Sequence, residues 1–147
     1  MSNNKLIYIY TDGACRGNPG PGGWGALLQY EEYKKEINGF SSLTTNNIME
    51  LTAVIESLKL IKFPSEIVIT TDSTYVKNGI NDWIHSWKSK GWKTANKKPV
   101  KNKELWQKLD NLSNLHTIEW KWVRGHTGHF GNERADQLAN DAIDKNI

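Results

Sequence analysis

The sequence predicts an α/β fold in which helices flank a five-stranded mixed sheet. Three short apolar runs at residues 5–11, 66–71 and 117–123 have the length and composition of strands, and segments with helical spacing separate them. Strands joined by helical crossovers run parallel, so these three runs are expected to form the parallel part of the sheet. Two further runs, which precede the first helix, are expected to add an antiparallel edge.

The N-terminal third of the chain contains the first three strands. Residues 5–11 form a continuous apolar run that suits a strand buried on both faces, and the run stops at Asp12. Six of the twelve glycines fall within residues 13–25, which we interpret as a turn-rich connection. Residues 23–30 and 32–40 are then predicted to be the two strands of a hairpin.

Helices are expected in the remaining segments. Apolar residues at spacings of three and four predict a helix over residues 46–62, which Pro64 ends. Ser73 can cap a second helix, and residues 105–112 show the spacing of a third. Asn132 is expected to cap the last helix, which carries small and apolar residues on one side.

Composition limits the class of protein. A chain of 147 residues is expected to form one domain, residues 1–147, around a single hydrophobic core. Its lone cysteine, Cys15, cannot form an internal disulfide, which favours a reducing compartment. The chain has no apolar run of membrane-spanning length and no N-terminal signal-peptide pattern. We therefore expect a cytoplasmic monomer that does not contact a membrane.

Residues 83–103 carry an unusual charge. The segment contains seven lysines and no acidic residue, so the formal net charge of +3 divides into +7 here and −4 over the other 126 residues. Three of the seven tryptophans are interleaved with these lysines. This combination favours a surface that binds a polyanion, because ammonium groups replace the counterions of phosphates. A solvated lysine face above tryptophans of the core is an equally good interpretation of the charge run alone.

Acidic residues occupy the places where an α/β sheet usually builds its site. Asp12 and Asp72 each end an apolar strand, and ligands of open α/β sheets bind at the carboxyl ends of the strands. Glu50 and Asp136 are expected in the first turns of two helices that can face the same edge. Each residue also has a structural explanation: a turn for each strand-ending Asp, a capping box with Asn47 for Glu50, and the helix dipole for Asp136.

Four carboxylates at one edge would repel one another strongly. A pair about 4 Å apart repels by roughly 4 kcal/mol at an effective dielectric constant of about 20. Two divalent cations would balance the four charges, and ligands that are all oxygen select hard ions such as Mg²⁺ or Mn²⁺. A pair of such ions is a common apparatus for cleaving a phosphodiester. The residues alone therefore predict a metal-dependent phosphodiesterase with a polyanion-binding arm.

Five motifs, in their order along the chain, resemble those of bacterial type 1 ribonuclease H. They lie at residues 10–25, 44–51, 71–76, 83–102 and 123–136. The resemblance extends from about residue 6 to residue 143, which is nearly the whole chain. It implies a ribonuclease H-like fold and endonucleolytic hydrolysis of the RNA strand of RNA–DNA hybrids, which leaves 5′-phosphate and 3′-hydroxyl ends.

The resemblance also assigns roles to individual residues. It implies two Mg²⁺ ions, which Mn²⁺ could replace, held by the catalytic carboxylates Asp12, Glu50, Asp72 and Asp136. His126 matches a catalytic histidine, and an imidazole suits the movement of a proton because histidine titrates near neutral pH. An RNA–DNA hybrid is the implied partner, and the matched substrate contacts are Asn18, Thr45, Asn46, Asn102, Trp83, Lys97, Lys98 and Lys101.

Two other functions are compatible with parts of the sequence. A related nuclease that cuts duplex DNA would share the sheet, but the Asn46-Asn47 pair and the lysines of residues 83–103 argue against it. A non-catalytic hybrid-binding module would gain nothing from four carboxylates that face phosphates. Leu43 and Thr74 stand where some relatives carry an arginine and a glutamine, which puts the corresponding nucleic-acid contacts in doubt.

Overall fold

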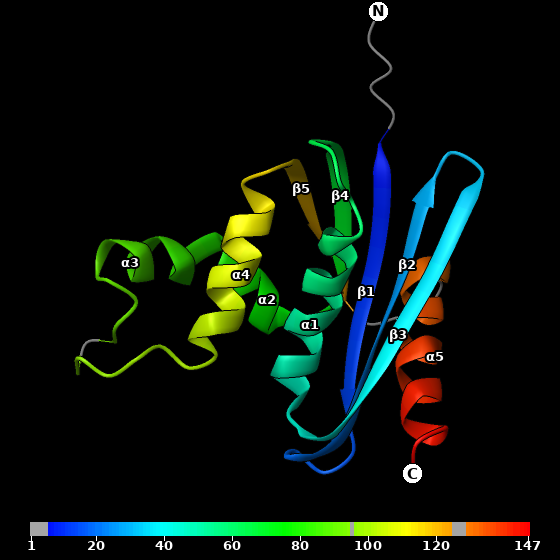
Figure 1. Cartoon of the computed structure of the whole chain (residues 1–147), viewed down its shortest axis with the longest axis horizontal. Helices are drawn as coiled ribbons and strands as arrows, with labels where there is room; N and C mark the ends of the chain where they lie inside the picture. Colours follow the sequence, from blue (N-terminus) through cyan, green and yellow to red (C-terminus); the bar gives the residue numbers. More distant parts are fainter. Residues whose placement is uncertain (1–5, 95, 125–128) are drawn as a thin grey trace, which may run out of the picture.

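The computed structural model describes residues 6–94, 96–124 and 129–147, and one five-stranded sheet forms its centre (Figure 1). The strands are β1 (Ile7–Cys15), β2 (Gly20–Tyr30), β3 (Tyr33–Thr44), β4 (Glu66–Thr71) and β5 (Thr117–Trp122). They lie in the order β3-β2-β1-β4-β5. β1 pairs antiparallel with β2 and parallel with β4, and β4 pairs parallel with β5. The predicted mixed sheet is confirmed.

Helices cover both faces of this sheet. They are α1 (Asn46–Lys59), α2 (Thr74–Asn78), the π-helical turn η1 (Gly79–Trp83), α3 (Ile84–Ser89), α4 (Lys103–Ser113) and α5 (Phe130–Asp144). α5 packs on β1, β2 and β3 from one side, while α1 and α4 lie on the other (Figure 1). The main core lies between α1, α4 and the sheet, and it includes the fully buried Ile9, Leu51, Ile69 and Trp106. None of the described helices is long and apolar enough to span a membrane.

The glycine-rich segment differs most from the prediction. β1 continues beyond Asp12, and only residues 16–19 separate it from β2. Gly13, Gly23 and Gly25 lie within β1 and β2 and are needed because helices approach the sheet closely there. A Cβ atom on Gly25, for example, would lie 2.5 Å from the carbonyl oxygen of Ala135 in α5. The prediction of a turn-rich connection over residues 13–25 was therefore wrong, because it assigned these glycines to turns.

Three boundaries lie a few residues from their predicted positions. β2 begins at Gly20 rather than at residue 23, β3 continues to Thr44 rather than to residue 40, and α1 ends at Lys59 rather than at residue 62. Backbone pairing between Gly20 and Thr44 extends both strands of the hairpin. Backbone pairing does not require apolar side chains, so the hydrophobic pattern underestimates the length of this hairpin.

The helix predicted after Ser73 is divided into three segments. The Ser73 hydroxyl accepts a hydrogen bond from the backbone N–H of Val76 at 3.1 Å, as expected for a cap. The π-helical turn η1 then separates α2 from α3. The ring of Trp106 in α4 packs on Gly79 so closely that a Cβ there would lie 2.5 Å from Cζ2. Because this contact is tertiary, the apolar spacing predicts the helical segment but not its interruption.

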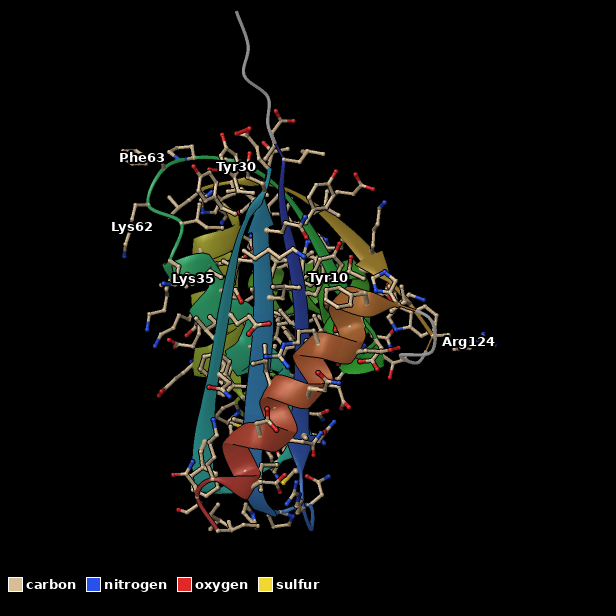
Figure 2. All side chains as sticks on the ribbon, turned by 90° about the vertical axis from the view of Figure 1, so that its right-hand side faces the viewer. Tyr10, Tyr30, Lys35, Lys62, Phe63 and Arg124 are labelled. Carbon is tan, nitrogen blue, oxygen red and sulfur yellow. The ribbon has the colours of Figure 1, made fainter. Side chains whose placement is uncertain are left out.

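The start of α5 is set by packing on β1. His129 is the cap, and its Nδ1 atom accepts a hydrogen bond from the backbone N–H of Asn132 at 3.4 Å. Asn132 is a fully buried residue of the first turn, so its predicted role as the cap was wrong. Figure 2 shows Tyr10 beside this end of α5, with its ring centroid 5.5 Å from that of His129. The helix therefore starts where it meets Tyr10, which the polar residues of its own sequence do not reveal.

Candidate active site

Four carboxylates gather at one end of the sheet. One oxygen from each of Asp12, Glu50 and Asp72 can be chosen so that the three atoms lie within 4.8 Å of one another. Asp136 lines the same cavity, which has a volume of about 330 Å³. The side chains come from β1, α1, the segment after β4, and α5, so only the tertiary fold brings them together. We call this site the carboxylate cavity.

The backbone explains how these side chains meet. Pairing between β1 and β4 stops two residues before Asp12 and Asp72, so the two residues lie at the same level, Asp12 within β1 and Asp72 just after β4. Gly13 allows α1 to approach β1, because a Cβ at this position would lie 2.5 Å from the backbone nitrogen of Glu50. A side chain at Gly13 would therefore push α1 away from the sheet and Glu50 away from Asp12.

The positions of Glu50 and Asp136 within their helices exclude the capping box and the helix dipole as explanations for these two carboxylates. The cap of α1 is Thr45 and that of α5 is His129, so Glu50 and Asp136 both lie in the second turn of their helices. A residue in the second turn does not complete a capping box with Asn47, nor does it meet the unpaired N–H groups of the first turn. The predicted first-turn positions were wrong because both caps lie earlier in the chain than expected.

Burial makes the charges of the carboxylate cavity unfavourable. Asp12 is 3% exposed and Glu50 is 5% exposed. Burial, followed by the neighbouring charges of Glu50 and Asp72, raises the pKa of Asp12 to about 10. Burial and the charge of Asp72 also raise the pKa of Glu50, although a hydrogen bond from the backbone N–H of Gly13 opposes the rise. The protein alone therefore favours the protonated forms of Asp12 and Glu50, and a bound cation would favour their ionised forms.

The donor set fits a divalent metal ion. Every candidate ligand is a carboxylate oxygen, and sites made only of oxygen suit hard cations. Within the described part of the chain, the buried Oε1 atom of Glu50 has no hydrogen-bond partner, which leaves it available to a ligand. Asp12, Glu50 and Asp72 would hold such an ion, and Asp136 faces the same cavity.

Three predicted substrate contacts adjoin the cavity on the side of α1. The Thr45 hydroxyl accepts a hydrogen bond from the backbone N–H of Ile48 at 3.2 Å and caps α1. The next residue, Asn46, donates its backbone N–H to Oδ1 of Asn18 at 2.9 Å and also lines the cavity. Asn18, Thr45 and Asn46 therefore form one polar group beside the carboxylates, although Asn18 lies 28 residues before Asn46 in the sequence.

Two further predicted contacts lie on the opposite side of the cavity, around Tyr75. The Tyr75 hydroxyl accepts hydrogen bonds from Nδ2 of Asn102 at 3.1 Å and from Nε1 of Trp106 at 2.9 Å. The ring of Trp83 meets that of Tyr75 edge-on, with centroids 5.6 Å apart, and Trp83 remains 36% exposed. Because Tyr75 also lines the cavity, it connects Asn102 and Trp83 to the carboxylate end of the sheet.

Residues 83–103, which we call the basic protrusion, project away from the sheet at α3 (Figure 1). Lys97, Lys98 and Lys101 are exposed. Trp87 is half-buried, and its ring lies 6.1 Å from that of Trp92. Trp87 and Trp92 therefore pack under the protrusion while its lysines face solvent, an arrangement that both interpretations of the segment allow.

The sequence predicts one further site residue, and the structure shows contacts around the site that the sequence analysis does not predict. His126 lies outside the described residues. The Trp122 indole N–H donates to the backbone carbonyl of Asp72 at 3.1 Å, and Nζ of Lys77 lies 4.4 Å from the centroid of a Trp122 ring. Asn140 donates to the Asp136 carboxylate, a contact that their spacing of four residues on a helix could have indicated. The Trp122 contact joins separate elements, so no local pattern reveals it.

Comparisons with known proteins agree over most of the chain. The family model for RNase H matches residues 4–144. The ribonuclease HI of Neisseria meningitidis serogroup B is 59% identical over 137 residues, which cover 93% of this chain and 94% of that protein. The ribonuclease H of Pseudomonas putida is 60% identical over 139 residues, which cover 95% of this chain and 94% of the relative.

Solved structures show the same fold. LC9-RNase H1, described as a type 1 RNase H with the type 2 active-site motif, superposes with a TM-score of 0.88 and 35% identity over 100% of this chain and 76% of its own. LC11-RNase H1 in complex with an RNA/DNA hybrid gives a TM-score of 0.69 and 28% identity over 95% of this chain and 97% of its own. With its carboxylate cavity, its mixed sheet and these relatives, the chain belongs to the ribonuclease H family, in its bacterial type 1 branch.

Proposed function

We propose that this chain is an endonuclease that hydrolyses the RNA strand of RNA–DNA hybrids and leaves 5′-phosphate and 3′-hydroxyl ends. The observation that carries the proposal is the buried convergence of Asp12, Glu50 and Asp72 at a cavity that Asp136 also lines. Relatives named ribonuclease H, and a solved relative bound to an RNA/DNA hybrid, support the choice of substrate.

The metal in this proposal is a pair of Mg²⁺ ions, which Mn²⁺ can replace. When bound, two such ions would neutralise the clustered carboxylates and stabilise the charge that develops on the reacting phosphodiester. Asp12 and Glu50 would release protons as they become ligands, because burial raises both pKa values in the metal-free protein. His126 is proposed to move a proton during the reaction or product release.

The hybrid is proposed to lie across the cavity between two groups of side chains. Asn18, Thr45 and Asn46 offer short amide and hydroxyl groups on one side, which can contact 2′-hydroxyls and base edges without selecting a sequence. On the other side, Asn102 and Trp83 are proposed to hold the DNA strand. Lys97, Lys98 and Lys101 would then neutralise phosphates farther along the duplex.

The competing functions explain fewer features of the site. A non-catalytic binding module would place buried carboxylates against phosphates, which weakens binding. A DNA-cutting nuclease would have no use for amide groups beside the cavity that can contact 2′-hydroxyls. We also propose that the enzyme is a single domain, because one sheet and its main core carry all four carboxylates. We propose that it acts as a monomer in the cytoplasm, the compartment that its lone cysteine favours.

A comparison of three labelled duplexes tests the proposed function. RNA–DNA, RNA–RNA and DNA–DNA duplexes of the same sequence are incubated with Mg²⁺, and again with EDTA. We expect cleavage of the RNA strand in the hybrid alone, and only with Mg²⁺. Rapid cleavage of the hybrid in EDTA would overturn the metal assignment, and equal cleavage of DNA–DNA would support the alternative nuclease.

A further inference from the structure

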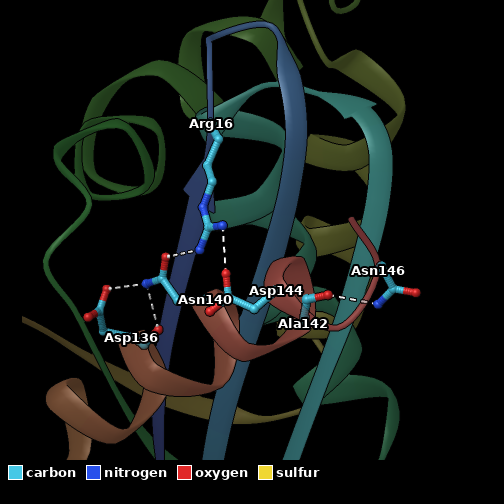
Figure 3. A network of polar contacts seen from close by, with 6 residues as sticks. All are labelled: Arg16, Asp136, Asn140, Ala142, Asp144 and Asn146. Carbon is cyan, nitrogen blue, oxygen red and sulfur yellow. Dashed lines mark hydrogen bonds and ion pairs between the residues drawn. The ribbon is translucent and has the colours of Figure 1, made fainter.

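One face of α5 carries a row of polar residues that begins at the carboxylate cavity. Asp136, Asn140 and Asp144 are four residues apart along this helix, so they lie one above the other on the same face. Figure 3 shows that Arg16, from the segment between β1 and β2, reaches this face from a part of the chain more than a hundred residues away. The row therefore joins two segments that are distant in sequence.

The contacts form a continuous chain from Arg16 to Asp136. Asn140 donates its Nδ2 to the Asp136 carboxylate at 3.2 Å and to the Asp136 backbone carbonyl at 3.0 Å. Its Oδ1 atom accepts a hydrogen bond from Nη2 of Arg16 at 3.3 Å. Nη1 of Arg16 lies 2.6 Å from a carboxylate oxygen of Asp144, which holds the guanidinium over the helix (Figure 3).

The chemistry of these groups allows only one orientation of the Asn140 amide. A guanidinium has donors and no acceptors, whereas an ionised carboxylate has acceptors and no donors. The amide oxygen must therefore face Arg16, and the amide nitrogen must face Asp136. The two acceptors of Asp136 already favour this orientation, and the guanidinium strengthens it by holding the amide oxygen on the other side.

We propose that Asn140 and Arg16 are positioning residues that hold the Asp136 carboxylate in the orientation needed to bind a divalent cation. Asn140 acts on Asp136 directly, and Arg16 acts through Asn140. This inference rests on the proposed function, in which Asp136 is a metal ligand. The Arg16 and Asp144 side chains are 40% and 60% exposed, so water screens their ion pair and the effect of Arg16 is the smaller one.

Metal binding by the metal-free protein is the direct test. Titration calorimetry with Mn²⁺ alone should show a Kd about tenfold higher for Asn140→Ala, which is the range found when a partner of a metal ligand is removed. Arg16→Met, which keeps the length of the side chain, should raise the Kd about threefold, and Arg16→Lys should restore most of the loss. The double variant should bind no more weakly than Asn140→Ala, because Arg16 has no separate route to Asp136.

Asn146, two residues beyond the end of α5, provides a matched control. Its Nδ2 donates to the backbone carbonyl of Ala142 at 2.7 Å, which is the same backbone contact that Asn140 makes, but without a carboxylate partner (Figure 3). Asn146→Ala should therefore bind Mn²⁺ with the wild-type Kd. The melting temperature of each metal-free variant separates a loss of metal affinity from a loss of folding.

Steady-state kinetics give a second readout. The proposal predicts that kcat of Asn140→Ala falls at low Mn²⁺ and returns towards the wild-type value at saturating Mn²⁺, while KM for the hybrid stays constant. A Kd for Asn140→Ala within about twofold of the Asn146→Ala value would overturn the proposal. Additive effects of Arg16→Met and Asn140→Ala would exclude the route through Asn140. If the wild-type chain bound no Mn²⁺, the proposed metal site itself would fail, and this positioning role with it.

Discussion

The carboxylate cavity and the basic protrusion are built in opposite ways. The cavity takes its acidic residues from four separate elements and buries two of them almost completely. The protrusion takes seven lysines from one continuous segment, and those with predicted substrate contacts are exposed. One region concentrates negative charge where water is scarce, and the other spreads positive charge where water is abundant.

This difference determines how each region should respond to change. Interactions between buried charges are strong and little affected by salt, so one substitution in the cavity should have a large effect. Exposed lysines act on phosphates through screened interactions that add up over several contacts. The cavity should therefore control the chemical step, and the protrusion should control salt-dependent affinity.

The largest effect is expected from Asp12→Asn. The change removes a charged ligand from the centre of the cavity, so cleavage should be abolished, while hybrid binding stays largely intact. Single-turnover cleavage and fluorescence anisotropy with a labelled hybrid measure the two properties. Asp141→Asn, at an exposed position of α5, is the matched control and should leave both unchanged. Retention of more than a tenth of the activity would contradict the metal role of Asp12.

A smaller loss is expected from His126→Ala. Removal of a group that moves a proton should slow turnover by about tenfold to about a hundredfold, with little effect on hybrid affinity. The rate should be measured over a range of pH and compared with that of His85→Ala, which alters an exposed histidine of α3. An unchanged rate at every pH would show that His126 has no catalytic role.

Replacement of three lysines of the protrusion should change salt dependence more than rate. The triple variant carries Lys97→Ala, Lys98→Ala and Lys101→Ala. In a plot of the logarithm of the hybrid-binding constant against the logarithm of the salt concentration, its slope should be less steep than that of the wild type by about 0.9 for each lost phosphate contact. The change would be about 2.7 if each of the three lysines contacts one phosphate. Anisotropy titrations at several salt concentrations measure this slope.

Two lysines elsewhere serve as the control for this experiment. Lys35 and Lys62 are exposed and lie on β3 and between α1 and β4, as Figure 2 shows. Their replacement by alanine should leave the slope unchanged. An equal slope for the wild type and for the triple variant would show that the protrusion's lysines face solvent in the complex as well.

The smallest effect is on the pH dependence of stability. In the metal-free protein, the raised pKa of Asp12 means that the folded state keeps a proton that the unfolded chain loses above about pH 4. The contribution of this bound proton to the free energy of unfolding is complete below about pH 4 and is lost as the pH rises towards about 10.

Melting curves in EDTA between about pH 5.5 and about pH 8.5 test this sign. The wild-type melting temperature should fall as the pH rises, and the fall should be smaller in Asp12→Asn, because the variant lacks that titrating group. Asp141→Asn should follow the wild-type curve. Identical slopes for Asp12→Asn and the wild type would show that burial does not hold this proton.

Much of the fold and the core of the site could be predicted from the sequence. The apolar runs and the helical spacing between them predict the strands and the parallel pairing of β1, β4 and β5, which the structure confirms. The positions of Asp12 and Asp72 at the ends of parallel strands predict that the two carboxylates lie close together. These inferences succeed because periodicity and chain connectivity are properties of the sequence itself.

Other features depended on contacts between distant segments. Glycine has two uses that look alike in a sequence, so Gly13 and Gly25 were assigned to a turn although they permit α1 and α5 to approach the sheet. The contact between Arg16 and Asn140 joins residues 124 positions apart, and no local pattern could indicate it.

By itself, then, the sequence determined the order of the elements, the set of acidic residues and the excess of lysine in one segment. Only the tertiary structure decided how deeply Asp12 and Glu50 are buried and which distant side chain reaches the row of polar residues on α5. The reason is physical: hydrophobic pattern and charge are local properties of a chain, whereas desolvation and side-chain orientation depend on every segment packed around a group.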